Sequence, residues 1–175
     1  MFRGVNNVNV DAKGRIAIPA RYRDHLLNHC QGEMVVTIDT EERCLLIYPQ
    51  PDWDDIQRKV EALPSFNAAA RRVQRLLIGH ATDIQMDNSG RILLTPPLRD
   101  YAQLEKKGVL LGQGKKLELW NEADWIERRD TGWMTPAAWS CRMNFRPCLC
   151  RCRRDDSTSP DGPARRGCPR SHYQS

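Results

Sequence analysis

Basic side chains gather around one short turn near the start of the chain: Arg3, Lys13, Arg15, Arg21 and Arg23. Cations at such a turn can bind phosphate groups, and an arginine can donate two hydrogen bonds to the O6 and N7 atoms of guanine in the major groove of DNA. In the plainer alternative, Arg15 packs across the turn and pairs with a neighbouring aspartate. Spacing by itself favours that alternative, so the elements around the turn have to be considered.

The turn has the pattern Asp-x-x-Gly and lies between two alternating segments. Residues 7–10 and 15–18 each alternate apolar with polar or small side chains, which predicts a β-hairpin. Asp11 can accept hydrogen bonds from the loop amides, and Gly14 can adopt the left-handed backbone that a three-residue loop requires. Pro19 then ends the strand and can open a helix. The predicted hairpin tip presents the basic residues.

The same turn occurs again 76 positions later in the chain. Asp87, Gly90 and Arg91 repeat the aspartate, the glycine and the arginine, while Ser89 stands where the first turn has Lys13. A pattern that recurs over some forty residues indicates a duplicated module. The second turn has one cation fewer, so it is the weaker candidate for contact with nucleic acid.

Other elements follow the same order in both halves. Residues 33–38 and 43–48 predict a strand pair, and helical spacing follows in 51–63 and, after a cap at Asn67, in 68–78. Each module of about 45 residues is too small to support a core alone. The two modules should therefore pack together or interleave their hairpins.

Charge is distributed unevenly along the chain. The formal net charge is +5, and residues 131–175, with eight arginines and three aspartates, account for all of it. Residues 1–130 are neutral overall, so any attraction to nucleic acid there must come from a local patch. The segment 131–175 is rich in Arg, Pro and Cys without periodicity, and it is predicted to be a disordered tail.

Nothing in the sequence indicates a membrane or secretory protein. No apolar segment of useful length follows Arg3, and the longest apolar run, residues 44–48, is far too short to cross a bilayer. We therefore expect a soluble, cytoplasmic protein with no membrane partner. Cys30 and Cys44 are predicted to be ordinary core residues of a reducing compartment.

Evidence for other chemistry is weak. His25, His29 and Cys30 lack the glutamate and the second ligand cluster of a zinc protease, and the spacing of the cysteines in 148–152 is not that of a structural zinc site. No glycine-rich phosphate loop or nucleophile motif is present. The sequence predicts no metal, no cofactor, no small-molecule substrate and no enzyme activity.

Several separated motifs resemble the MraZ family of bacterial transcriptional regulators, which have two SpoVT-AbrB-type DNA-binding modules. They are the duplicated Asp-x-x-Gly-Arg turn, the start Met1-Phe2-Arg3-Gly4, the segment 71–81 and the pair Gly112-Gln113 before 117–120. The resemblance covers roughly residues 1–129 and does not include the tail.

The resemblance implies an α+β, mainly β fold. It is a duplicated AbrB-like swapped-hairpin (double-split) β-barrel with pseudo-twofold symmetry and connecting helices. The expected parts are a first module at 5–48, a helical linker at 49–80, a second module at 81–124 and the tail at 131–175.

The resemblance also implies a function in transcription. A ring-shaped homo-oligomer, associated with the nucleoid, would bind double-stranded DNA at short direct repeats in the promoter of the division and cell-wall gene cluster and act as a repressor. The implied DNA-binding residues are Arg3, Lys13, Arg15, Arg21, Arg23 and Arg91, and the turn-forming residues are Asp11, Gly14, Asp87 and Gly90. The alternative is an oligomeric interaction scaffold with only weak, nonspecific DNA binding, which would lack a steep salt dependence.

Overall fold

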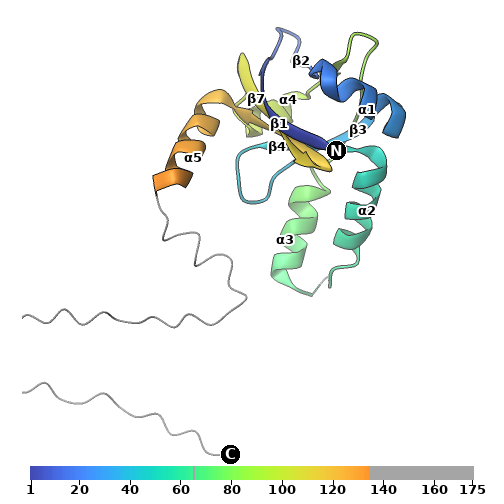
Figure 1. The fold of residues 1–175 in the computed structure, drawn as a ribbon. Helices are drawn as coiled ribbons and strands as arrows, with labels where there is room; N and C mark the ends of the chain where they lie inside the picture. The colour runs from blue at the N-terminus through green and yellow to red at the C-terminus, as the bar shows by residue number, and fades with distance from the viewer. Residues whose placement is uncertain (65, 135–175) are drawn as a thin grey trace, which may run out of the picture. The chain divides into compact units, whose positions relative to one another are not determined.

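A computed structural model describes residues 1–64 and 66–134 of the chain (Figure 1). These residues belong to one compact unit, Met1–Thr135. The last helix ends at Met134, inside the segment expected to be the tail. The prediction of disorder for the rest of that segment lies outside the described residues.

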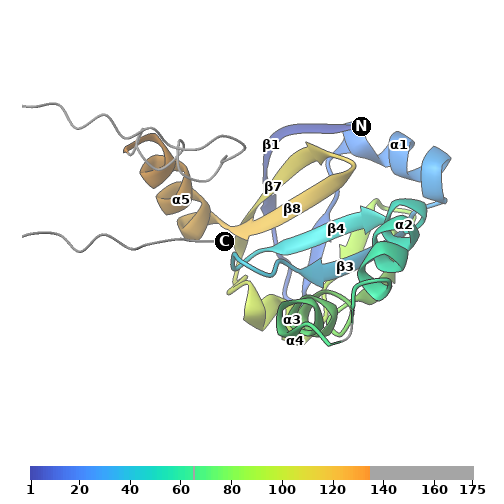
Figure 2. The same cartoon turned by 90° about the horizontal axis from the view of Figure 1, so that it is seen from below.

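Six antiparallel strands form the main sheet, in the order β1-β7-β8-β4-β3-β5 (Figure 2). The strands are β1 (Phe2–Asn9), β3 (Glu33–Ile38), β4 (Leu45–Pro49), β5 (Thr82–Gln85), β7 (Lys107–Gly114) and β8 (Lys116–Asn121). The edge strands β1 and β5 do not pair with each other in the described part of the chain, so the sheet is not closed. The fold is α+β and mainly β.

Two short strands form a separate ribbon. β2 (Arg15–Ala17) pairs antiparallel with β6 (Arg91–Leu93), which places Ile16 directly opposite Ile92. Both isoleucines are almost completely buried. The ribbon therefore joins the two halves of the chain through their most apolar turn-flanking residues.

Backbone hydrogen bonds also join each turn to the other half of the chain. Ile18 N donates to Gly90 O at 2.8 Å, and Leu94 N donates to Gly14 O at 3.0 Å. Each turn is thus bonded to the strand that follows the other turn. In Figure 1 the two turns project from the same side of the unit as a blue and a green loop.

The predicted local hairpin was wrong in its strand partners. β1 pairs with β7 along its whole length, not with β2. The first turn itself is closed locally, by the Val10–Ile16 bridge and by a bond of 2.9 Å from Asp11 N to Arg15 O. Alternation identified the strands, but it could not show that each one is completed by a distant segment.

Five helices complete the described unit, and each begins at a proline or at a capping asparagine. They are α1 (Ala20–Cys30), α2 (Gln50–Glu61), α3 (Ala68–Leu77), α4 (Pro96–Tyr101) and α5 (Glu122–Met134). Asn67 caps α3, because its side-chain oxygen accepts from Ala69 N at 2.8 Å. Figure 1 shows α2 and α3 on the side opposite the two turns. None of the helices in the described ranges is long and apolar enough to cross a bilayer.

The apolar core has two parts, one on each face of the main sheet. Strand β4 contributes to both, since Leu45 and Ile47 face the part that includes the ribbon, while Leu46 and Tyr48 face the part that includes Trp53 of α2. This explains why β4 is apolar without alternation. Ile16 and Ile92 of the ribbon belong to the first of these parts, and the opposite face of the ribbon points away from it.

Candidate nucleic-acid interface

The first turn is organised by a single carboxylate. Asp11 Oδ1 accepts hydrogen bonds from the backbone N of Lys13 at 2.9 Å and of Arg15 at 2.8 Å, and Oδ2 accepts from Arg15 Nε at 2.8 Å. Gly14 has a φ of 81°. The bond from the backbone of Arg15 holds the pKa of Asp11 below its usual value, although partial burial opposes this shift. Asp11 therefore stays ionised and fixes the Arg15 side chain.

The second turn repeats the backbone geometry without the ion pair. Asp87 Oδ1 accepts from the backbone N of Ser89 at 2.9 Å and of Arg91 at 2.8 Å, and Gly90 has a φ of 73°. The guanidinium of Arg91 is exposed and forms no ion pair with the residues that the structure describes. The two turns thus differ in how firmly each arginine is held.

Four side chains form the outer ribbon face: Arg15, Ala17, Arg91 and Leu93. They point away from the core because side chains alternate along a strand and the intervening isoleucines point inward. Arg15 lies opposite Leu93, and Arg91 lies opposite Ala17. The two arginines stand at diagonal corners, about 7 Å apart along the strands. Leu93, an apolar residue that sequence reasoning missed, is 53% exposed beside Arg15.

Arg3 and Arg21 lie at the start of β1 rather than at the turn. Arg21 packs over the Tyr22 ring, 4.7 Å from its centroid, and donates to the Tyr22 hydroxyl at 2.9 Å. Arg3 is exposed and donates to the sulfur of Met1 at 3.5 Å. The length of β1 separates this pair from Lys13, which is exposed in the first turn.

Arg23 lies against the turn of the other module. A Cβ atom placed on Gly90 would lie 2.5 Å from Arg23 Cζ, so the guanidinium covers this glycine. Arg99 covers Gly14 in the same way. Sequence reasoning missed Arg99 as a site residue, although the offset of 76 positions makes it the counterpart of Arg23.

These placements give the two turns different charges. The first turn has Lys13, Arg15 and Arg99 against Asp11, a net charge of +2. Around the second turn, two arginines, Arg23 and Arg91, oppose one aspartate, a net charge of +1. The first turn is therefore the stronger site for a polyanion.

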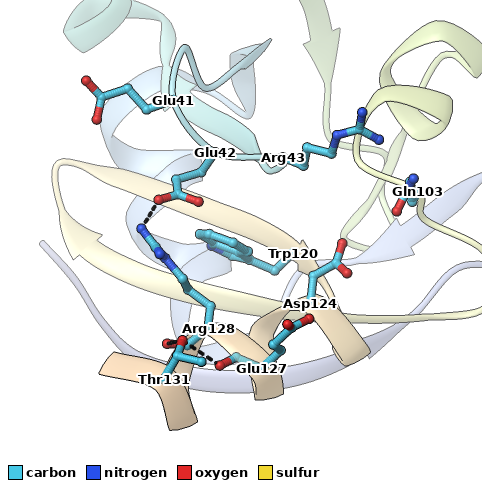
Figure 3. Close-up of a pocket in the computed structure, with 9 residues that line it drawn as sticks. All are labelled: Glu41, Glu42, Arg43, Gln103, Trp120, Asp124, Glu127, Arg128 and Thr131. Carbon is cyan, nitrogen blue, oxygen red and sulfur yellow. Dashed lines mark hydrogen bonds and ion pairs between the residues drawn. The ribbon is translucent and has the colours of Figure 1, made fainter. Parts of the chain in front are cut away.

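A pocket between the β3–β4 loop and α5 has the opposite character (Figure 3). Its lining residues are Glu41, Glu42, Arg43, Gln103, Trp120, Asp124, Glu127, Arg128 and Thr131. Figure 3 shows the Arg128 guanidinium paired with the Glu42 carboxylate. Four carboxylates against two guanidinium groups leave a net charge of −2, which repels phosphate. This pocket does not suit nucleic acid.

His25, His29, Cys30 and Cys44 belong to no candidate metal cluster in the part of the chain that the structure describes. Among the described residues no group of three or more His, Cys, Asp or Glu side chains could hold a metal ion. The rings of His25 and His29 stack 5.5 Å apart, and His29 hydrogen-bonds Asp52 at 3.1 Å. Burial raises the pKa of the Cys30 and Cys44 thiols, so neither is poised as a thiolate.

The described residues form an antiparallel α+β fold that presents two basic turns on one side. A model of the family described as "MraZ protein, putative antitoxin-like" matches the chain twice, at residues 1–76 and 77–130. The chain belongs to the MraZ family.

Curated relatives agree with this assignment. The chain is 57% identical over 138 residues to the Transcriptional regulator MraZ of Halorhodospira halophila, which covers 79% of this chain and 90% of that protein. With the protein of the same name from Coxiella burnetii it shares 59% identity over 130 residues, 74% of this chain and 86% of the relative. These names describe transcriptional regulators and not enzymes.

Proposed function

We propose that this chain is a DNA-binding transcriptional regulator, and that the first turn and the outer ribbon face form its DNA interface. Membership of the MraZ family supports the class of function. The observation that carries the proposal is the Arg15 side chain, held by Asp11 in a turn of net charge +2. Spacing alone had favoured simple packing for this arginine. The ion pair with Asp11 does not prevent Arg15 from also contacting DNA, because Arg15 lies on the outer ribbon face.

The geometry leaves the useful part of the Arg15 guanidinium free. Its Nε donates to Asp11, so the two terminal nitrogens can donate to O6 and N7 of a guanine. A major groove about 12 Å wide admits a two-stranded ribbon. Each bidentate contact discriminates between bases by about 1–3 kcal/mol. Because Asp11 already fixes the side chain, less conformational entropy is lost on binding.

The other predicted cations take secondary roles in this proposal. Lys13 contacts phosphate beside the first turn, and Arg91 does so from the opposite corner of the ribbon. Arg3, Arg21 and Arg23 already pack on other groups of the chain, and we assign them to supporting the interface. Phosphate contacts set affinity and orientation, while Arg15 reads the base.

One such turn is too weak to specify an operator, so we propose that several copies act together. The family resemblance supports a ring-shaped homo-oligomer that binds short direct repeats in the promoter of the division and cell-wall gene cluster, in the cytoplasm and at the nucleoid, as a repressor. When several DNA-binding turns belong to one oligomer, binding of the first raises the effective concentration of the others at neighbouring repeats, so the overall affinity exceeds that of a single turn. Within each chain we propose modules at 5–48 and 81–124, a linker at 49–80 and an AbrB-like swapped-hairpin barrel, supported by the β2–β6 exchange.

A gel-shift experiment with a repeat-containing promoter fragment tests this proposal. Arg15→Ala should abolish specific binding, and the matched variant Arg15→Lys should keep the charge but lose base discrimination. Circular dichroism and sizing check that both variants keep the fold and the oligomer. Wild-type affinity should fall steeply between about 50 and 200 mM salt. Unchanged affinity in Arg15→Ala, or a flat salt response, would favour the interaction scaffold instead.

A further inference from the structure

We propose that Arg99 is a positioning residue for the DNA-contacting turn of the opposite module, and that Arg23 has the mirror role at the second turn. The inference rests on the proposed function, because it concerns how the first turn is kept in shape for DNA. It assigns to Arg99, in the second half of the chain, control over Arg15 in the first half.

The contact between Arg99 and Gly14 is close. A Cβ atom placed on Gly14 would lie 2.8 Å from Arg99 Nε, 2.9 Å from Cζ and 3.2 Å from Cδ. Arg99 therefore occupies the space into which a side chain at position 14 would project, and Gly14 is buried. Gly14 is required twice, once for its positive φ and once for the space that Arg99 occupies.

The contact is reciprocal. Arg23 covers Gly90, and Arg23 Nε donates to Ile18 O at 2.8 Å. The backbone N of Ile18 in turn donates to Gly90 O at 2.8 Å. One residue, Ile18, thus ties Arg23 and the second turn together. Each helix that follows a turn in sequence sends its arginine to the turn of the other module.

The two arginines differ in how they are satisfied. Arg99 Nε is buried and has no hydrogen-bond partner in the described structure, unlike Arg23 Nε. A buried donor without a partner disfavours folding. The Nε end of Arg99 therefore gains no hydrogen bond here, and its observed contact is the cover that it places on Gly14.

The contact between Arg99 and Gly14 affects Arg15 through two linked interactions. Gly14 N donates to Asp11 O at 2.9 Å, which closes the turn, and the Asp11 side chain then holds the Arg15 guanidinium. With Arg99 truncated, the glycine would lose its cover and gain backbone freedom. The Asp11–Arg15 pair would then be held in the binding geometry for a smaller fraction of the time.

A matched pair of variants tests the order of effects. Arg99→Ala and Arg23→Ala each remove the side-chain atoms that cover a glycine of the opposite turn. We expect Arg99→Ala to weaken binding to the repeat-containing promoter fragment about tenfold and Arg23→Ala less than about threefold. Promoter binding then depends more on the arginine of α4 than on the arginine of α1, although α1 is the helix that follows the first turn in sequence. A larger loss in Arg23→Ala would overturn the assignment.

Amide hydrogen exchange gives a readout that does not depend on DNA. In Arg99→Ala the amides of Gly14 and Arg15 should exchange about tenfold faster, while those of Gly90 and Arg91 should not change. Arg23→Ala should show the reverse. A merely structural role would accelerate exchange at both turns together, and that result would contradict the proposal. If Arg15→Ala binds DNA normally while exchange follows the expected pattern, only the proposed DNA site has failed.

Two further variants separate positioning from direct contact with phosphate. Arg99→Gln places a planar amide where Arg99 has its Cδ and Nε, and Arg99→Lys keeps the charge without the plane. If Arg99 acts by covering Gly14, Gln should preserve promoter binding and turn protection better than Lys. If Lys preserves promoter binding better, Arg99 acts on DNA directly and the positioning role is wrong. Should Arg99→Ala lower the melting temperature, the comparison of Arg99→Gln with Arg99→Lys decides the question.

Discussion

Arg15 and Asp11 are joined by both backbone and side chain, since Asp11 Oδ1 accepts from Arg15 N and Oδ2 accepts from Arg15 Nε, each at 2.8 Å. At the second turn Asp87 makes only the backbone bond to Arg91. A duplicated pattern has therefore produced one arginine that is fixed by an ion pair and one that forms no ion pair with the described residues.

Arg91→Ala should cost less DNA affinity than Arg15→Ala. Without an ion pair to the described residues, the Arg91 side chain loses more conformational entropy on binding, and its turn has the smaller net charge. Gel shifts on the same promoter fragment would compare the two variants, with sizing to confirm that both keep the wild-type assembly. Equal losses would mean that both turns read DNA to the same extent.

Asp11→Asn should separate specific from nonspecific binding. Asparagine keeps an oxygen that can accept from the backbone of Arg15, but it removes the charge that fixes the guanidinium. The charge of the first turn rises from +2 to +3, so affinity for random DNA at low salt should increase while the preference for the promoter falls. Asp87→Asn is the control and should change promoter preference little. Stronger promoter preference in Asp11→Asn would contradict this prediction.

The same aspartate should make the first turn sensitive to acid. The backbone of Arg15 holds the pKa of Asp11 below 3.8, so the folded state favours the ionised form. Its contribution to stability is then present above pH 3.8 and is lost as the pH falls through the lower folded pKa. Melting temperatures of wild type and Asp11→Asn should differ at neutral pH and converge in acid. A constant difference down to about pH 2 would argue against this linkage.

Thr37→Val should destabilise the contact between α3 and the sheet. Thr37 is fully buried in β3, and its hydroxyl donates to Leu77 O at 2.6 Å. Valine has nearly the same shape but leaves that carbonyl without its partner, which should lower the free energy of unfolding by about 1–2 kcal/mol. Urea denaturation measures the change. Thr37→Ser keeps the hydroxyl and should lose less, and an equal loss would point to packing instead.

Removal of residues 135–175 should weaken nonspecific DNA binding at low salt. These residues contain eight arginines and three aspartates, a net charge of +5, and their sequence lacks a periodic apolar face. Promoter preference and melting temperature should stay unchanged in the truncated chain. A large fall in melting temperature would show that the sequence prediction for this segment is wrong.

Local chemistry could be predicted from the sequence because it depends on neighbouring residues. The two Asp-x-x-Gly turns, the cap at Asn67 and the helix that begins at Pro96 all follow from short-range hydrogen bonding and backbone preference. The internal repeat could be read in the same way.

Long-range pairing could not be predicted, because alternation shows which face of a strand is buried but not which strand lies beside it. β1 pairs with β7 in the main sheet and β2 pairs with β6 in the separate ribbon, and in both cases the partner strand lies far away in the sequence. For the same reason the covering of Gly14 by Arg99 had no local signal. Only the repeat offset, which matches Arg99 to Arg23, could have suggested a shared role.

Because Ile16 pairs with Ile92, the ribbon cannot form until the ribosome has synthesised the second turn. Translation at about 5–20 residues per second separates the two isoleucines by roughly 4–15 s. During that interval β2 of the nascent chain lacks its partner strand β6. β1 lacks its partner for longer, because β7 is synthesised after β6. Codons that slow the ribosome between the two halves would prolong this exposure, and we expect them to lower the yield of folded protein.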